Sequence, residues 1–192
     1  MNNSLFRVEV LPFLGLFSAL LVATLVGDLL LHALGLVWIG RYLGIPGTLL
    51  ILLSLWYSLR KRKVVQYGSP QILLKIHENF TWLGALMVFI HAGVHFNAVL
   101  PWLATVAMMV NIISGLVGRY LLNRSRRYLA EREEIYRFHG LSQDAVQAKI
   151  FWDAVTYELM AKWREVHFPI SFVFAVLALG HIISVFLFWE WP

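Results

Sequence analysis

Five long apolar runs, separated by short charged or proline-containing breaks, constrain the fold of this chain more than any other feature of its sequence. An α-helix needs about 20 apolar residues to cross the hydrocarbon core of a bilayer, and only helices and closed barrels satisfy their backbone hydrogen bonds there. The sequence therefore predicts an all-α integral membrane bundle of five transmembrane helices, formed by a single domain over residues 1–192. The predicted spans cover roughly residues 10–36, 42–59, 72–100, 101–122 and 166–189.

The composition supports a membrane location. Hydrophobic residues make up 59% of the chain and charged residues only 14%, whereas about 25% of a soluble domain is charged. The net charge of +5 does not indicate a nucleic-acid partner, because the basic residues flank the apolar runs. The absence of cysteine excludes disulfides, thiolate-held iron–sulfur clusters and a cysteine nucleophile within this chain.

The basic residues also predict the orientation of the chain. All but one of the 16 lysines and arginines lie at Arg7, in residues 60–75 or in residues 119–165; the exception is Arg41. Because cytoplasmic loops carry the excess of basic residues, we expect the N-terminus inside and the C-terminus outside, in a membrane of the bacterial inner-membrane type. Four tryptophans are then expected at the outer boundary: Trp38, Trp102, Trp189 and Trp191.

The segment between the fourth and fifth runs is charged and long for a loop in a small bundle. Ser142 is a typical helix N-cap, and Phe151, Trp152, Val155 and Leu159 then share one helical face. We therefore expect a cytoplasmic amphipathic helix that lies in the membrane interface. This segment is also a candidate docking site for a soluble partner.

Two pairs of histidines have the same spacing. His77 and His91 are 14 residues apart in the third run, and His167 and His181 are 14 apart in the fifth. Fourteen residues is close to four helical turns, so each pair shares a face, with about 21 Å between its members along the axis. The two helices are separated by one span and therefore run parallel. His77 is expected to pair with His167 on the inner side, and His91 with His181 on the outer side.

Two imidazoles at one level can bind one haem iron from both sides, and helix bundles commonly hold cofactors between facing helices. With both axial positions filled, the expected role is electron transfer and not oxygen activation. Structural histidines bonded to carbonyls are the alternative, while zinc would need more ligands at each level. Room for the macrocycles is expected at Gly84, Gly93 and Gly180.

This pattern resembles the diheme transmembrane cytochromes b: the ferric-reductase-like and cytochrome b561-like membrane domains and, more distantly, the cytochrome b of quinol:cytochrome c complexes. The shared feature is a pair of histidines about 14 residues apart on each of two helices, here within residues 75–189. The resemblance implies two haem b groups, electron passage across the membrane and a link to the quinone pool.

The resemblance also implies a partner. Related reductases carry a flavin and nicotinamide domain after the last helix, whereas this sequence has no Gly-rich dinucleotide motif. We therefore expect the electron-transfer membrane subunit of a quinol/quinone oxidoreductase complex, with an iron–sulfur, flavin or cytochrome c protein as redox partner and no catalytic residue of its own. The alternatives are a stand-alone membrane reductase of a small molecule or metal at the outer face, and a haem-free membrane transporter or assembly protein.

Four further residues are candidates for the same chemistry. His95 lies one turn beyond His91 and competes with it as a ligand; the equal spacing favours His91, which leaves His95 to contact a propionate or a quinone. Asp28 and His32 share a face of the first run and, with His95, form a candidate outer quinone or proton site; the alternative is a pair that only stabilises helix packing. Arg119 is a candidate propionate contact, although positive-inside bias explains it equally well.

Overall fold

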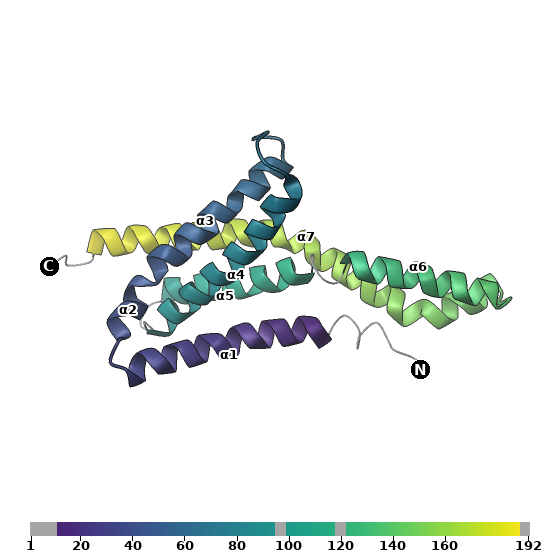
Figure 1. Cartoon of the computed structure of the whole chain (residues 1–192), viewed down its shortest axis with the longest axis horizontal. Helices are drawn as coiled ribbons and strands as arrows, with labels where there is room; N and C mark the ends of the chain where they lie inside the picture. Colours follow the sequence, from purple (N-terminus) through teal and green to yellow (C-terminus); the bar gives the residue numbers. More distant parts are fainter. Residues whose placement is uncertain (1–10, 95–98, 118–121, 189–192) are drawn as a thin grey trace. The chain divides into compact units, whose positions relative to one another are not determined.

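The computed structural model describes residues 11–94, 99–117 and 122–188, and over these ranges it consists of helices with no strand. The all-α fold class is thus confirmed for the described part of the chain (Figure 1). The helices are α1 (Leu11–Ala33), α2 (Val37–Tyr42), α3 (Gly44–Lys61), α4 (Pro70–Val94), α5 (Val99–Leu116), α6 (Leu122–Phe138) and α7 (Gln143–Phe188).

Five segments within the described ranges are long and apolar enough to cross a membrane, as the sequence predicts. The chain is therefore a multi-pass membrane protein with five candidate spans. The second of them begins earlier than predicted, because the short helix α2 leads through Leu43 into α3 and adds its apolar residues. The segments are Leu14–Ala33, Val37–Lys61, Pro70–Gly93, Val99–Leu116 and Glu165–Phe188.

The chain forms two compact units. Unit 1 comprises Met1–Ser18 and Val106–Val176, and unit 2 comprises Ala19–Thr105 and Leu177–Pro192. Their boundaries fall inside α1, α5 and α7 and not in linkers. The single-domain organisation of residues 1–192 stays a prediction.

In unit 2, α3 and α4 pack closely at a pair of glycines. A Cβ atom on Gly84 would lie 2.8 Å from the carbonyl oxygen of Gly47, and one on Gly47 would lie 3.0 Å from the carbonyl oxygen of Gly84. Glycine pairs of this kind let helix backbones approach each other in membranes. The expectation that Gly84 leaves room for a macrocycle is therefore wrong, because its open side is filled by α3.

The turn before α4 follows the break seen in the sequence. Gly68 adopts a φ of +94°, which glycine tolerates and other residues rarely do. The carbonyl oxygen of Ser69 accepts a hydrogen bond from the backbone N–H of Leu73 at 3.0 Å. Pro70 occupies the first helical position, where its missing N–H has no helical partner to lose. This start sets the register that places His77 and His91 on α4.

In unit 1, the predicted interfacial helix is not a separate element. Residues 143–164 continue without a break into the last span, so that α7 is one helix of 46 residues. Pro169 lies inside it and cannot donate to the carbonyl of Glu165, but such prolines are tolerated in membrane helices. The predicted N-cap is confirmed, because the Ser142 hydroxyl accepts a hydrogen bond from the N–H of Ala145 at 3.4 Å.

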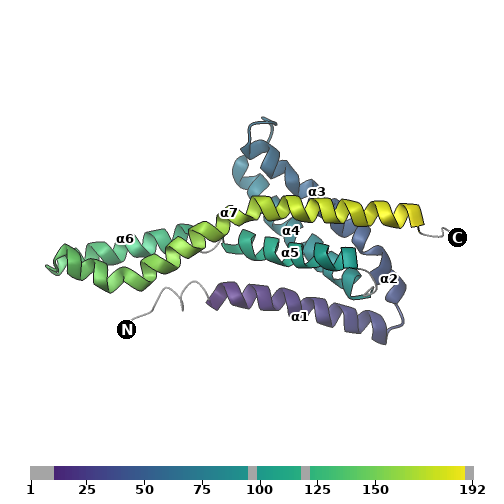
Figure 2. The ribbon, with the colours of Figure 1, turned by 180° about the vertical axis from the view of Figure 1, so that it is seen from behind.

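The first half of α7 pairs with α6 instead of standing alone. Figures 1 and 2 show the two segments side by side, joined by a tight turn in which Gly140 has a φ of +75°. Val146 and Ile150 are buried on α7, and the ammonium group of Lys149 lies 5.1 Å from the ring centroid of Tyr136 on α6. The sequence pattern does not predict this pairing. It identifies the apolar face that contains Trp152, but it does not show that α6 covers the face that contains Val146 and Ile150.

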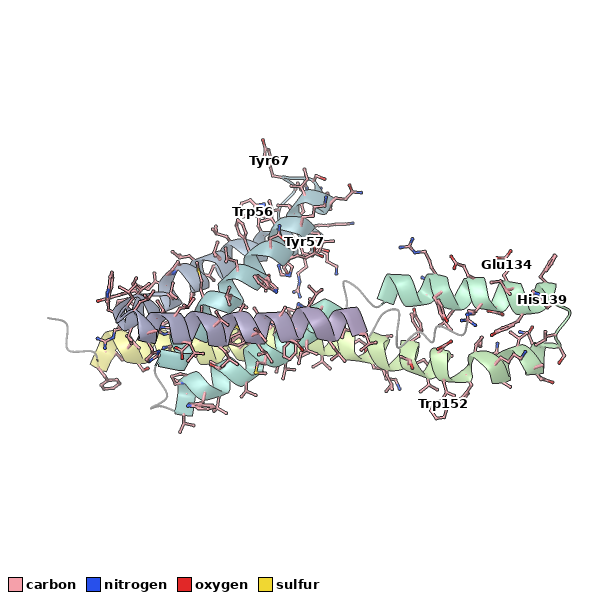
Figure 3. All side chains as sticks on the ribbon, turned by 60° about the horizontal axis from the view of Figure 1, so that its bottom comes forward. Trp56, Tyr57, Tyr67, Glu134, His139 and Trp152 are labelled. Carbon is pink, nitrogen blue, oxygen red and sulfur yellow. The ribbon has the colours of Figure 1, made fainter. Side chains whose placement is uncertain are left out.

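The face predicted to be apolar is open. Trp152 is 76% exposed, and Phe151 and Leu159 are also exposed. Figure 3 shows the Trp152 side chain directed away from α6. We call α6, the turn at Gly140 and the first half of α7 the helical hairpin. Its apolar side chains at Phe151, Trp152 and Leu159 are available for contact with another surface.

The glycine contact between α3 and α4 generates a stability prediction. Replacement of Gly84 with Ala places a methyl group 2.8 Å from a backbone oxygen, so we expect the free energy of unfolding in detergent to fall by about 1–3 kcal/mol. Gly15→Ala is the matched control, because nothing lies within 4 Å of a Cβ there. Its expected effect is a gain of up to about 1 kcal/mol from helix propensity. Equal stability of the two variants would contradict the close packing.

Candidate functional site

The structure brings His91 and His181 together within unit 2. Their ring centroids are 6.3 Å apart, and the ring planes are inclined by 52°. An imidazole nitrogen binds a transition metal at about 2 Å, so two imidazoles on opposite sides of one metal have centroids roughly 6 Å apart. The separation of this pair therefore matches that of two axial ligands.

His91 is oriented by the short helix α2. Its Nδ1 lies 3.2 Å from the carbonyl oxygen of Gly40, which is buried. Because a carbonyl oxygen only accepts, Nδ1 must carry the hydrogen of this bond. In the neutral ring the lone pair is then on Nε2, the form that binds metals.

Gly44 gives the His91 ring its space. A Cβ at this position would lie 2.9 Å from both Cδ2 and Nε2 of His91. Separations under 3.0 Å require something to shift, and here the neighbour is a ring already held at its other nitrogen. Any side chain at position 44 would therefore displace the ring.

His77, also in unit 2, is held in the same way by α3. Its Nδ1 lies 3.0 Å from the carbonyl oxygen of Ser54, so its Nε2 is again the nitrogen with the lone pair. The Ser54 hydroxyl is buried and donates to the carbonyl of Ile51 at 2.6 Å. Tyr57 lies beside the ring, with centroids 5.5 Å apart.

His167 is anchored within unit 1 by α5. Its Nδ1 lies 2.8 Å from the hydroxyl oxygen of Ser114 and 3.2 Å from the carbonyl oxygen of Asn111. The Ser114 hydroxyl is fully buried and donates to that same carbonyl at 2.7 Å. Since the carbonyl accepts both bonds, the hydrogen of the histidine lies on Nδ1.

Two further residues complete the surroundings of His167. A Cβ on Gly115 would lie 3.3 Å from Cε1 of the ring, so a glycine stands beside this histidine as Gly44 stands beside His91. The Ser171 hydroxyl lies 2.7 Å from Oδ1 of Asn111 and 2.6 Å from the carbonyl oxygen of His167. Ser171 thus links α7 to the residue of α5 whose backbone carbonyl accepts from the ring.

These three histidines differ from two others in the described chain. The Nδ1 atoms of His32, on α1, and His139, just after α6, lie 2.9 and 2.7 Å from carbonyl oxygens four residues earlier, and both side chains are exposed. Such local bonds do not orient a ring relative to another helix. The bonds of His77, His91 and His167 instead reach a different helix, so they orient each ring relative to its neighbours.

The sequence could not identify most of these orienting groups. Gly40, Ser54 and Asn111 act through backbone carbonyls, which carry no residue-type signal. Ser114 is the exception, because it is a polar residue in an apolar span that also contains Asn111. Gly93 lies against Asp28 of α1 and Gly180 against Leu100, and their expected places beside the macrocycles stay predictions.

Other predicted site residues are not brought together here. His77 and His167 belong to different units, so their pairing stays a prediction. His95 and Arg119 lie outside the described residues, as do Trp189 and Trp191.

Asp28 and His32 do lie together on α1. Their Nδ1 and Oδ1 atoms are 3.6 Å apart, and the His32 Nδ1 lies 2.9 Å from the backbone carbonyl of Asp28. The shared face predicted from their spacing is therefore observed.

Among the described residues, no group of three or more histidine, cysteine, aspartate or glutamate side chains could hold a metal ion. A tetrahedral zinc site needs three or four protein ligands, and the described residues do not supply one. The two-histidine arrangement of His91 and His181 suits a metal whose other ligands come from a macrocycle.

Comparisons with protein-family models, curated proteins and solved structures each find no match to this chain.

The Ser114 contact generates a prediction about His167. Ser114→Ala removes the closest partner of a half-buried ring nitrogen, so we expect the free energy of unfolding to fall by about 1 kcal/mol. The Nδ1–H proton of His167 should also exchange faster in nitrogen-edited NMR spectra of histidine-labelled protein.

Ser184→Ala is the control, because that hydroxyl bonds only to the carbonyl of His181 in its own helix. It should leave the exchange of the His167 proton unchanged. If both variants change that exchange equally, Ser114 does not anchor the ring.

Proposed function

We propose that this chain is the membrane subunit of a quinone-linked oxidoreductase complex and carries electrons across the membrane through two haem b groups. We assign His91 and His181 to one haem, and we assign His77 and His167 to the other from their matched spacing in the sequence. The observation that carries the proposal is the 6.3 Å separation of the His91 and His181 rings. These side chains come from helices far apart in sequence, so their separation is not a product of local helix geometry.

The orientation of the rings supports the same chemistry. Three of the four proposed ligands direct Nδ1 at a group on another helix. Metal-bound histidines almost always donate a hydrogen bond from the N–H of the ring nitrogen that does not bind the metal. This bond fixes the tautomer and raises the basicity of the nitrogen that does. At three positions the ring hydrogen is therefore on Nδ1 and the ring lone pair is on Nε2, the nitrogen that would bind a metal.

Haem, when bound, supplies a one-electron couple. The work of the chain is to hold the imidazoles on both sides of each macrocycle and to keep a low-dielectric surrounding of apolar helices. The ligands on α4 are 14 residues apart, so the proposed sites are separated by about 21 Å along the helix. This spacing extends over most of the hydrocarbon thickness of about 30 Å.

The partners in this proposal are the quinone pool and a redox protein of the iron–sulfur, flavin or cytochrome c class. The distribution of the basic residues supports an N-terminus in the cytoplasm and a C-terminus outside, in a membrane of the bacterial inner-membrane type. The hairpin of α6 and α7 is then cytoplasmic. Residues 143–164 of α7 extend about 33 Å beyond the span, which gives a soluble partner a surface on which to dock.

An optical spectrum of the purified full chain tests the haem assignment. Dithionite reduction is expected to produce a b-type α-band, with two haems per chain by pyridine haemochrome analysis. His91→Ala and His181→Ala should remove the same haem, and combining them should remove no more than either alone. His77→Ala and His167→Ala should remove the other. Absence of an α-band from well-folded protein would overturn the proposal.

Two further variants make the ligand assignment specific. His139→Ala is the matched control, because that ring bonds to a carbonyl four residues earlier and lies in the charged hairpin. It should retain both haems. His95→Ala should also retain both; if it loses a haem while His91→Ala does not, His95 is the outer ligand.

The Gly44 contact predicts a separate effect on haem content. Gly44→Ala puts a methyl group 2.9 Å from Nε2 of His91 and so displaces the ligand. We expect the haem of His91 and His181 to be lost or its reduction potential to shift, while the other haem is unchanged. Redox titration followed at the α-band measures this, with Gly15→Ala as control. An unaltered titration would place the metal elsewhere than on His91.

A further inference from the structure

Asp28 is a carboxylate inside the span Leu14–Ala33. Ionisable side chains within a membrane are costly and are functional candidates by default. Its Oδ1 atom is buried and has no hydrogen-bond partner in the part of the chain that the structure describes. Buried carboxylate oxygens normally accept hydrogen bonds, so the Asp28 carboxylate has acceptor capacity that the described residues leave unused.

The position of this oxygen is set by contacts between α1 and α4 within unit 2. A Cβ on Gly93 would lie 3.3 Å from Oδ1 and 3.4 Å from Cγ of Asp28. One residue earlier on α1, Gly27 packs against Ile90 of α4. The carboxylate therefore rests against α4 beside a residue with no side chain, two positions after His91.

His32 adds a second acceptor on the same face. Its Nδ1 is the donor to the Asp28 carbonyl at 2.9 Å, so Nε2 of the neutral ring carries a lone pair. The side chain of His32 is 52% exposed and that of Asp28 is 27% exposed. Together they offer a carboxylate oxygen and an imidazole nitrogen, both of which suit a hydroxyl donor.

Access to Asp28 is through apolar surroundings. Leu25 and Leu29, on either side of it in sequence, are 64% and 67% exposed. In a membrane-spanning helix, exposed leucines face lipid, so a ligand from the bilayer reaches the 27% of the Asp28 side chain that is exposed. The ligand class must therefore be lipid-soluble and must carry a hydroxyl group.

We infer that Asp28 and the ring of His32 form a binding site for the head group of a hydroquinone. One hydroxyl of the hydroquinone donates to the exposed part of the Asp28 carboxylate, which rests against Gly93 of α4, two positions after His91. The choice of hydroquinone among lipid-soluble hydroxyl compounds rests on the proposed electron-transfer function, whereas the acceptor site rests on the Asp28 carboxylate alone.

Binding of tetramethylhydroquinone to the full chain in lipid nanodiscs tests this site. Saturation-transfer NMR or calorimetry gives the Kd for the wild type, for Asp28→Asn and for Gly93→Ala. We expect Kd to rise about tenfold in Asp28→Asn, because a hydrogen bond to a charged acceptor is replaced by a neutral one. Gly93→Ala should also weaken binding, because its methyl group crowds the carboxylate.

Two controls separate a specific site from partition into lipid or general damage. Asp153→Asn changes a carboxylate outside the candidate spans and should bind like the wild type. The dimethyl ether of the same hydroquinone lacks the donor and should bind at least about tenfold more weakly than the hydroquinone. Equal affinity of Asp28→Asn and wild type, or of ether and hydroquinone, would overturn the inference.

The outcome is distinguishable from that of the haem proposal. Haem content and the α-band of Asp28→Asn should equal those of the wild type, since Asp28 is not a proposed ligand. A chain that binds hydroquinone through Asp28 but contains no haem would leave this site standing while electron transfer fails. A chain that contains both haems but binds hydroquinone equally well without Asp28 would overturn this site and leave the haem proposal standing.

Discussion

Hydrogen bonds from histidine Nδ1 to an oxygen on another helix link the membrane-spanning parts of this chain. They join α4 to α2 through His91 and Gly40, and α4 to α3 through His77 and Ser54. A third joins α7 to α5 through His167. In lipid the hydrophobic effect does not drive helices together, so packing and interhelical hydrogen bonds must do so. The same bonds that associate the helices also orient the rings.

This arrangement depends on close approach, and small residues provide it. A carbonyl oxygen inside a helix already accepts one bond, but its second lone pair remains available when a donor comes near. Gly44 and Gly115 let the rings of His91 and His167 lie close to neighbouring backbone, and Gly84 brings α3 against α4. Helix packing and ring placement in this chain are therefore not independent.

Much of the fold follows from the sequence, because hydropathy and helix length depend on local composition. The sequence does not predict that α7 is continuous, because the exposed apolar face at Trp152 resembles that of an interfacial helix. It also does not predict the burial of Val146 and Ile150, because that burial depends on contact with α6. The equal histidine spacing predicted the proximity of His91 and His181. The anchors at Gly40 and Ser54 were beyond prediction, because a backbone carbonyl has the same chemistry in every residue.

The anchored imidazoles have a consequence for biogenesis. Ordering a side chain on binding costs roughly 0.5–1.5 kcal/mol for each rotamer-rich group, and three of these rings are already ordered by bonds within the folded chain. Insertion of the helices and their association can therefore be completed first. The proposed haems would then enter sites whose ligands are already oriented, and their affinity would not be reduced by the entropy of ordering those rings.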